Sequence, residues 1–478
     1  MALPKWIKKF RKQGTEIRCI NGYYYVYAYS SRYDSKLKRS KKVTGKLLGK
    51  ITRRAGFTPS EKYQLLTRGF KNLSCCEYGA FELFTLLMRK DIDLLKEIFV
   101  SNWQQIIASA MCRWIYRSPI KNMRYHFEES FYAQQWDIGM GGKQIGFLLQ
   151  YLGDQRGKII QYKKQLVRGN DFLLIDSTPV NSQSKHMGIN EVGYNSHREY
   201  DPQVNLLYIF SAKIQEPLYY RVLSGNIREV KAFKYCLQES GIPNATVVCD
   251  KGFYSAPNVA LLRNEKFRFI MPLRRNNKLV DYTPIKQGGY ASFEKFFMYH
   301  KRPIWYYRYK INGYSVCTYL DTTTKTQEET DFIYRIATHP EQYSMEIFLK
   351  KQHTMGTLSL LYEGVGKDPK NLYTCYKIRN DIEVMFDTFK TFLHADRTYM
   401  QSEKALQGWM FINFLAVRAY YKLYKKLKDE DLLSRFSPSD IIHRVSVLKK
   451  IKINNQWHFN EISSKDISLY NKIGLSHT

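Results

Sequence analysis

The chain has 478 residues, with 75 Lys and Arg against 43 Asp and Glu and a formal net charge of +32. This length allows several domains with sizeable cores. Such an excess of positive charge repels itself unless a polyanion is the usual partner, which argues against a merely basic soluble protein. Nucleic acid is the first candidate partner, because neutralised phosphates release their counterions.

Cysteine usage and hydropathy exclude further classes. The eight Cys contain no C-x-x-C pair, which argues against a zinc site or a disulfide framework and for a reducing, cytosolic compartment. The basic start MALPKWIKKFRKQG lacks an apolar run, so we expect no secretory signal. The longest apolar stretch, Gly408 to Tyr421, is too short to span a bilayer and contains Arg418, so we expect no membrane partner.

The N-terminal part (1–55) is predicted to be a β-rich, basic segment. Residues 17–52 contain EIRCINGYYYVYAYSSRYD, with a Gly turn and a Tyr/Val run, and then KKVTGKLLGKI. The loop SKLKRSKK (35–42) between them is strongly positive. Two interpretations stay open for this loop: it contacts DNA backbone, or it is a solvated turn.

Residues 56–165 are predicted to be helical. Thr58-Pro59-Ser60-Glu61 has the composition of a helix start, with Pro near the first turn. ELFTLLMRKDIDLLKEIF repeats apolar residues at spacings of three and four. We expect this region to bind DNA or to form a dimer contact, although no clear helix-turn-helix is present.

From residue 171 strands and helices alternate. DFLLID is a short apolar run of the kind that forms a buried central strand. The order that follows is NLLYIFSAKI (strand), PLYYRVLSG (strand), EVKAFKYCLQESG (helix), ATVVCD (strand), ALLRNEK (helix) and FRFIMPL (strand). This order predicts an α/β sandwich with mixed strand directions.

The remaining segments differ in their pattern of apolar and polar residues. Residues 276–345 are Tyr-rich and alternating, with an Asn312-Gly313 turn, and predict a β-rich insertion. Helical sequence returns at about 371 and continues through GWMFINFLAVRAYYKLYKKLKD. The last part, 426–478, is predicted to be a mainly helical C-terminal region.

Two of the predicted strands end in a carboxylate, at Asp176 (FLLIDS) and Asp250 (TVVCDKG). Sites in α/β sheets gather at the carboxyl ends of strands, so two adjacent central strands would bring the two acids together. Two close anions repel unless a divalent cation lies between them, and carboxylate oxygens suit Mg²⁺ or Mn²⁺. The alternative is that each Asp caps the turn that follows it. The pair, in so basic a chain, favours the metal site.

A third carboxylate is expected from YKIRNDIEVMFDTFK (376–390). With about 100° per residue on one helix and Tyr376 at zero, Arg379 falls near 300°, Glu383 near 340° and Lys390 near 320°. These four side chains share a stripe about 60° wide beside an apolar face. Asp387, near 20°, competes with Glu383, and the angles alone do not choose between them.

A simpler interpretation of this helix is also open. Arg379 and Glu383 are spaced i,i+4, and Asp387 and Lys390 i,i+3. Both pairs would then be surface ion pairs worth about 0.2–0.5 kcal/mol each.

The spacing Tyr376-x2-Arg379-x3-Glu383-x6-Lys390 matches the YREK signature at every position. The chain resembles the DDE transposases of bacterial insertion sequences, in the group with that signature (the insertion-sequence-four type). FLLIDST resembles the strand of the first Asp in this family, and VVCDKGFYS resembles the strand and turn of the second. The long interval before Glu383 fits the β insertion of this group. The resemblance covers about 170–425.

The resemblance implies a ribonuclease H-like catalytic core, a mixed sheet flanked by helices, over 166–275 and 346–425, with 276–345 inserted. It implies that Asp176, Asp250 and Glu383 are catalytic and bind two Mg²⁺ ions, with Mn²⁺ as a substitute, for in-line attack on a phosphodiester. Tyr376, Arg379 and Lys390 then bind DNA phosphates near the cleaved end. The implied partners are double-stranded DNA, as element ends and target, and a second copy in a homodimer on DNA, in a prokaryotic cytoplasm.

One departure and two alternatives accompany the resemblance. Many relatives have a Thr-Asn pair ahead of the signature helix, where this chain has Glu363 in LSLLYEGVG. The alternative functions are a metal-dependent nuclease that cuts without joining, and a non-catalytic DNA-binding protein derived from a transposase. Because the three acids and the signature are intact, we expect a competent enzyme.

Overall fold

The structure is a computed structural model that describes residues 3–34, 38–60, 63, 73–167, 172–194, 200–225, 229–242, 245–366, 368–453 and 455–476. The chain divides into two compact units, one made of 1–76 with 449–461 and the other of 77–448 with 462–478. Within the described ranges, none of the helices combines the length and the apolar character that a membrane crossing requires.

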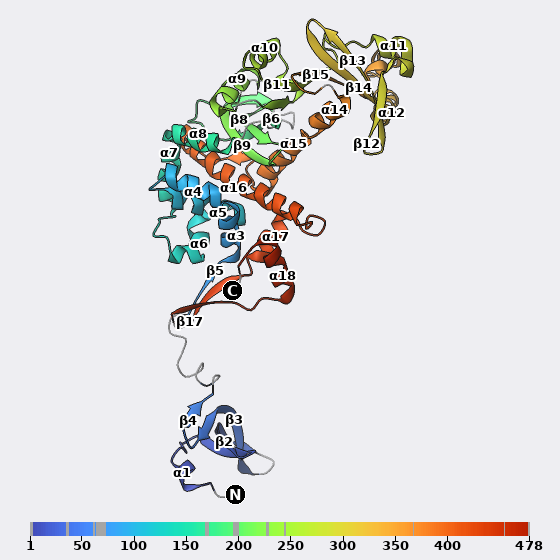
Figure 1. The fold of residues 1–478 in the computed structure, drawn as a ribbon. Helices are drawn as coiled ribbons and strands as arrows, with labels where there is room; N and C mark the ends of the chain where they lie inside the picture. Colours follow the sequence, from blue (N-terminus) through green and yellow to red (C-terminus); the bar gives the residue numbers. More distant parts are fainter. Residues whose placement is uncertain are drawn as a thin grey trace. The chain divides into compact units, whose positions relative to one another are not determined.

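The first unit contains an antiparallel sheet in the order β1-β2-β3-β4, preceded by the short helix α1 (Figure 1). The elements are α1 (Lys5–Lys8), β1 (Thr15–Ile20), β2 (Tyr23–Asp34), β3 (Arg39–Thr52) and β4 (Gly56–Pro59). Ile7, Val26 and Ile51 form its small buried core. The β structure predicted for residues 17–52 is present, and Asn21 and Gly22 make the first turn with positive φ.

The helix start predicted at Thr58-Pro59-Ser60-Glu61 is wrong. Thr58 and Pro59 lie in β4, where they pair with Lys50 and Gly49 of β3. An edge strand tolerates Pro, because the missing N–H is not needed on its open side. Gly49 makes this pairing possible, since a Cβ there would collide with the backbone of Thr58. Glu61 lies outside the described residues.

A second, three-stranded sheet has the order β18-β17-β5. Its strands are β5 (Ser74–Glu77), β17 (Lys449–Ile453) and β18 (Gln456–Phe459). The part expected to be mainly helical, 426–478, therefore contains an antiparallel strand pair between helices α17 (Pro438–Val445) and α18 (Ser464–Ile473).

The region 56–165 was predicted to be helical, and its part from residue 79 onward forms the helices that open the second unit. The prediction is wrong for Gly56–Pro59 and Ser74–Glu77, which are strands β4 and β5. The helices are α3 (Gly79–Leu87), α4 (Arg89–Ile98), α5 (Trp103–Tyr116), α6 (Met123–Glu128), α7 (Gly142–Asp154) and α8 (Arg156–Leu166). ELFTLLMRKDIDLLKEIF forms two of them, because the chain turns at Met88. Most apolar side chains of both helices are buried, as their spacing predicts, but Leu86 is exposed.

The centre of this unit is an 11-stranded mixed sheet with the order β12-β13-β14-β15-β11-β10-β6-β8-β7, in which β16 also pairs with β6 and β9 with β8. Its strands are β6 (Phe172–Ser182), β7 (Glu191–Tyr194), β8 (Tyr200–Ser211), β9 (Glu216–Ser224), β10 (Thr246–Cys249), β11 (Arg268–Leu273), β12 (Lys295–Tyr299), β13 (Arg302–Ile311), β14 (Tyr314–Asp321), β15 (Thr357–Glu363) and β16 (Arg397–Thr398). Helices α9 (Glu229–Ser240) and α10 (Ala256–Asn264) lie between strands in the predicted order, so the expected mixed α/β core is confirmed.

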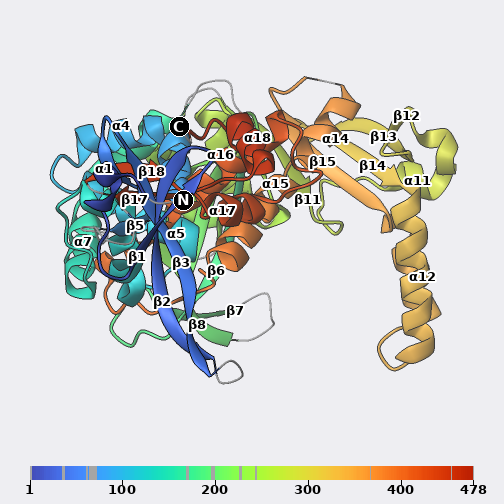
Figure 2. The same ribbon diagram turned by 90° about the horizontal axis from the view of Figure 1, so that it is seen from below.

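The predicted β-rich insertion supplies β12, β13 and β14, which extend the main sheet through β15. It also contains helices that the sequence did not predict, α11 (Thr283–Gly288), α12 (Thr322–Thr338) and the start of α13 (Met345–Lys351). None of the residues of α12 is buried. Figure 2 shows α12 extending away from the end of the sheet.

The long helix α16 (Glu403–Asp429) connects the sheet with the helices before it. It packs against α5, α7 and β9 and lies between the sheet and helices α4 and α5 (Figure 1). Gly408 and Gly153 permit its close approach to α7, since a Cβ at Gly408 would collide with the backbone of Leu149 and one at Gly153 with that of Lys404.

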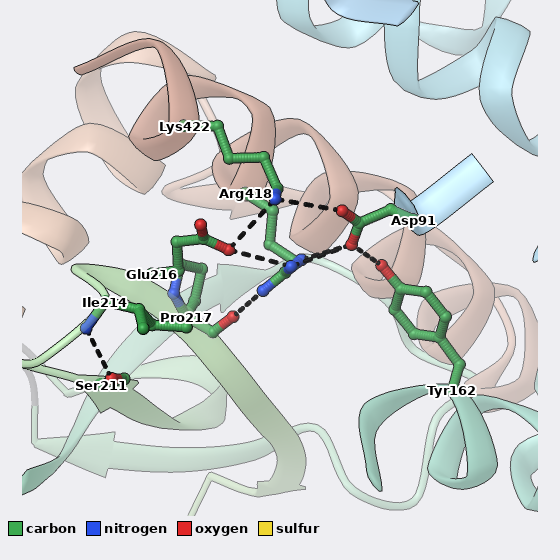
Figure 3. Close-up of polar contacts among 8 residues, drawn as sticks. All are labelled: Asp91, Tyr162, Ser211, Ile214, Glu216, Pro217, Arg418 and Lys422. Atoms are coloured by element: carbon green, nitrogen blue, oxygen red, sulfur yellow. Dashed lines mark hydrogen bonds and ion pairs between the residues drawn. The ribbon is translucent and has the colours of Figure 1, made fainter. Parts of the chain in front are cut away.

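A buried charge network fixes the same junction (Figure 3). Arg418 of α16 donates to Asp91 of α4 at 2.9 Å and to the carbonyl of Pro217 at 2.6 Å, and it pairs with Glu216 of β9 at 3.0 Å. Tyr162 of α8 donates to the same Asp91 oxygen at 2.5 Å. Burial alone would raise the pKa of Asp91, but the neighbouring cations and the hydrogen bonds outweigh burial and lower it.

Candidate active site

The two strand carboxylates lie side by side. Strand β10 runs parallel to β6 with Cys249 opposite Ile175, so Asp250 follows at the level of Asp176. Both strands are central, with β8 and β11 as their outer neighbours. The expectation that Asp176 ends its strand is wrong, because β6 continues to Ser182 and pairs there with β8 and β16.

The register also fixes the face on which Asp176 lies. Asp176 pairs with Tyr208 of β8, and paired side chains of an antiparallel ladder lie on the same face. The Tyr208 ring packs 5.8 Å from Phe386 and 6.1 Å from Phe389, between ring centroids. Asp176 therefore lies on the face that the signature segment covers.

The turn-capping alternative for Asp250 is not what the structure has. Asp250 precedes the short turn Lys251–Phe253, but its side chain makes no capping hydrogen bond there. Its Oδ1 lies instead 3.4 Å from Nη1 of Arg379. Oδ1 of Asp176 accepts from the N–H of Ser177 at 2.8 Å, and its Oδ2 lies 3.7 Å from the same Nη1 of Arg379.

One guanidinium thus joins three carboxylates. Nη2 of Arg379 donates to Oε1 of Glu383 at 2.6 Å, while Nη1 lies near both aspartates. The side chains of Arg379 and Asp176 are 15% exposed, Asp250 is 30% exposed and Glu383 51%. The cluster is therefore open to solvent on the side of Glu383, where a substrate has access.

Electrostatics and aromatic packing hold this guanidinium in place. Burial would lower the pKa of Arg379, but nearby Tyr376 and the three carboxylates raise it overall. Its guanidinium carbon lies 5.9 Å from the ring centroid of Tyr376. Burial raises the pKa of the Tyr376 hydroxyl, so Tyr376 is neutral and able to donate a hydrogen bond.

The single helix predicted over 376–390 is interrupted. Helix α14 (Pro369–Lys377) ends in a turn at Ile378 and Arg379. There the N–H of Arg379 donates to the backbone carbonyl of Tyr376, three residues earlier. Helix α15 (Asn380–Asp387) follows, and Thr388–Phe392 forms a π-helical turn closed by the bond from Leu393 N–H to the Thr388 carbonyl. A uniform step of 100° therefore does not apply across the whole segment.

These interruptions change the predicted stripe. Tyr376, Arg379 and Glu383 come together, but Lys390 lies within the π turn, whose residues advance around the axis by smaller steps than in an α-helix. Burial lowers the pKa of Lys390, and the acids that act on it are Asp387 and Asp396. Lys390 thus has an acidic environment of its own. No Pro or Gly marks either interruption, so neither could be predicted from the residues present.

Asp387 and Glu363, the other two acids considered, have different partners. Among the ion pairs of the described residues, Arg379 pairs with Glu383 and not with Asp387. Glu363 pairs with Arg263 at 2.6 Å. It lies opposite Phe269 near the start of β11, and parallel β10 runs from that level toward Asp250. Glu363 therefore lies away from the carboxylate cluster.

The donor set fits a hard divalent cation, because three carboxylates converge on one positive group. Among the described residues, however, no three acidic, His or Cys side chains are close enough together to hold a metal ion. The guanidinium of Arg379 lies between the carboxylates and acts as their counter-charge. The ion pair of Arg379 with Glu383 is the one that their i,i+4 spacing offered as an alternative. The contacts of Arg379 with Asp176 and Asp250 were not predicted, because the family resemblance assigned this side chain to phosphate.

We compared the chain with known protein families, curated proteins and solved structures. The profile of the family described as "Transposase DDE domain" matches residues 168–418. No curated protein matches the chain. Among solved structures, a cryo-EM structure of a piggyBac transposase synaptic complex with hairpin DNA is similar at 10% identity, with a TM-score of 0.42, covering 79% of this chain and 82% of that one.

Proposed function

This chain belongs to the family of transposases with a DDE domain, and from that premise we propose that it cuts and joins DNA with Asp176, Asp250 and Glu383 as its catalytic carboxylates. The observation that carries the proposal is the contact of Arg379 with all three acids. Side chains from two adjacent strands and one helix converge on one cation, as a site for hard cations requires.

We propose that the sheet and its helices form a ribonuclease H-like core. Parallel β6 and β10 carry the two aspartates at one level, and α15 brings Glu383 to the same face. The chain would bind the ends of a mobile DNA element, expose 3′-OH groups and join them to target DNA. Two copies would act together on two ends.

Asp176, Asp250 and Glu383 would hold Mg²⁺ or Mn²⁺ ions. When bound, such ions activate the attacking oxygen and stabilise the leaving oxygen at a phosphodiester. The protein residues would position the DNA. Arg379 offers planar donors that match a phosphate, and Tyr376 adds a neutral hydroxyl donor beside it. Lys390 is proposed to bind phosphate farther along the backbone.

This scheme requires Arg379 to exchange partners. In the structure its donors are directed at carboxylates that would hold the metal ions. A DNA phosphate beside the cluster would draw the guanidinium to itself and leave the carboxylates for the cations. DNA and metal binding would then support each other, because each removes the ion pairs that oppose the other.

A strand-transfer assay tests the proposal. Purified chain is incubated with DNA carrying the element end, with Mg²⁺, and joined products are separated from cut ones. We expect joined products from the parent chain and none from the Asp176→Asn variant. Cutting without joining, from an end that carries a 3′-OH, would support a nuclease instead. Metal-independent DNA binding with neither product would support a non-catalytic DNA-binding protein.

A further inference from the structure

The outer half of the β2–β3 pair is a two-stranded ribbon. Strand β1 pairs with residues 23–28 of β2, and β4 pairs with residues 49–52 of β3. Beyond these, residues 29–33 and 40–44 form the β2–β3 ladder, and we name them the distal ribbon. At its base, the N–H of Tyr29 also donates to the Gly14 carbonyl at 2.9 Å. Figure 2 shows β2 and β3 continuing side by side past the rest of their sheet.

A bulge separates the distal ribbon from the four-stranded part. The β2–β3 register shifts between Val26 and Tyr27 and again between Tyr27 and Tyr29. Gly45 lies at the second shift, where a Cβ would come within 3.1 Å of the Ala28 carbonyl oxygen. Bulges bend a strand pair and increase its twist. The bulge thus sets the distal ribbon off from its sheet, and the side chains of Arg32 and Lys41 on one of its faces are exposed.

On one face of the distal ribbon, two cations lie side by side. Arg32 and Lys41 are directly opposite each other in the ladder, and both are exposed. Like charges at such a position destabilise a strand pair. Among the side chains that the structure describes, none forms an ion pair with either of these two cations. An anion between them would remove the repulsion.

The opposite face is different. Lys42, the neighbour of Lys41, lies 2.5 Å from Glu16 and 4.2 Å from the ring centroid of Tyr29. Its charge is therefore already matched within the protein. Two adjacent lysines on one strand thus differ: Lys42 has an acidic partner, whereas Lys41 has none among the side chains that the structure describes.

We propose that the distal ribbon binds double-stranded DNA, with Arg32 and Lys41 on backbone phosphates at the edges of a groove. A two-stranded β-ribbon has the width that the major groove of B-DNA admits. Residues 1–60 carry sixteen Lys and Arg and two Asp and Glu, so the sheet that supports the ribbon is itself strongly positive. The inference rests on the proposed function, because it assigns a DNA contact that the transposition reaction requires.

The test measures how binding depends on salt. Full-length chain is titrated into a fluorescein-labelled duplex of mixed sequence, in EDTA to prevent cleavage, over a series of KCl concentrations. The test variant is Arg32→Thr with Lys41→Thr, and the matched control is Lys42→Thr. Thr has a high strand propensity, so the ribbon is expected to persist. Circular dichroism and thermal unfolding check that each variant is folded.

The proposed DNA contact of the distal ribbon is supported if the slope of log K, the DNA-binding constant, against log [KCl] falls in magnitude by about 2 in the double variant. Each phosphate contact contributes roughly 0.9 to this slope. Lys42→Thr is expected to leave the slope close to that of the parent. An unchanged slope in the double variant, or an equal change in Lys42→Thr, would overturn the assignment. The same loss on a single-stranded oligonucleotide would overturn groove binding.

These outcomes are separable from those of the proposed function. A parent chain that shows no salt-dependent duplex binding would count against transposition itself. A parent chain that binds, with a slope that the double variant shares, would count against the ribbon alone.

Discussion

Nη1 of Arg379 lies 3.4 Å from Oδ1 of Asp250, a carboxylate from a strand far earlier in the chain. The same guanidinium also contacts Asp176 and Glu383, so a cation of the protein lies where the proposed metal ions would bind. Ion pairs of this kind stabilise the chain without ligands, and they compete with any metal for the same oxygens.

The first prediction concerns this competition. Arg379→Ala removes the counter-charge and leaves three carboxylates to repel one another. We expect the variant to unfold at a lower temperature than the parent in EDTA, and to gain more from Mn²⁺ than the parent does. The measurement is thermal unfolding with and without Mn²⁺, in the absence of DNA. Arg379→Lys, which keeps a point charge, is the control and should lie between them. An Mn²⁺-induced shift no larger than that of the parent would contradict the competition.

The second prediction separates Glu383 from Asp387. Glu383→Gln keeps the size of the side chain but removes a metal-binding charge. The rate of DNA cleavage should therefore fall about a thousandfold or more, which corresponds to a loss of several kcal/mol of transition-state stabilisation. Asp387→Asn, one turn later on the same helix, should retain most activity. Duplex binding in EDTA should change little in either variant. If Asp387→Asn abolishes cleavage and Glu383→Gln does not, the third carboxylate is Asp387.

Sequence reasoning succeeded where local pattern and tertiary environment agree. FLLI and VVC are apolar because both faces of a central strand are buried, and the structure places them side by side in β6 and β10. The order of strands and helices up to β11 was also predicted correctly, because local pattern and tertiary environment agree there too. The adjacency of Asp176 and Asp250 was a conditional prediction, and the parallel pairing satisfies the condition.

Prediction from the sequence failed where the interactions that decide the structure are not local. Helix α12 buries none of its residues, so DTTTKTQEET had no apolar stripe to reveal it. Thr58 and Pro59 resembled a helix start, but pairing with β3 made them a strand. The interruptions at Arg379 and at Thr388–Phe392 carry no Gly or Pro. The uniform helix geometry from which the position of Lys390 was predicted therefore does not hold over the whole segment.

The third prediction uses a buried lysine. Lys163 of α8 is 5% exposed and donates to the carbonyl of Tyr220 at 2.9 Å. Burial lowers its pKa to about 7 from an ordinary 10.5, despite the opposing charge of Glu239. The folded chain thus binds fewer protons than the unfolded chain between these values, so stability rises with pH across this window. The cost of burial is full below about pH 7 and vanishes above the unfolded pKa.

Lys163→Met should therefore stabilise the chain by about 2 to 4 kcal/mol near pH 6, and by much less near pH 9. Denaturant unfolding at the two pH values measures the difference. Lys164→Met, the adjacent residue, is the control and should show no such pH dependence. A gain for Lys163→Met that is equal at both pH values would show that Lys163 is not neutralised in the folded chain.

The fourth prediction concerns the network that holds α16 to the sheet. Arg418→Met would leave Asp91 and Glu216 with Lys422 as their remaining cation among the described ion pairs. A buried charge without its partner costs about 3–5 kcal/mol of folding free energy, and urea unfolding should show this loss. Arg397→Met, which removes an exposed ion pair with Asp396, should cost less than about 1 kcal/mol. A loss as small for Arg418→Met would mean that the network contributes little.

The most direct test is to locate the metal. Fe²⁺ bound in place of Mg²⁺, with ascorbate and peroxide, generates hydroxyl radicals that cut the peptide backbone near the ion. With element-end DNA bound, we predict cuts near Asp176, Asp250 and Glu383 that excess Mg²⁺ suppresses and that Asp176→Asn with Glu383→Gln abolishes. Cuts elsewhere that Mg²⁺ suppresses, or cuts at these positions that persist in the double variant, would contradict a metal site built from these three carboxylates.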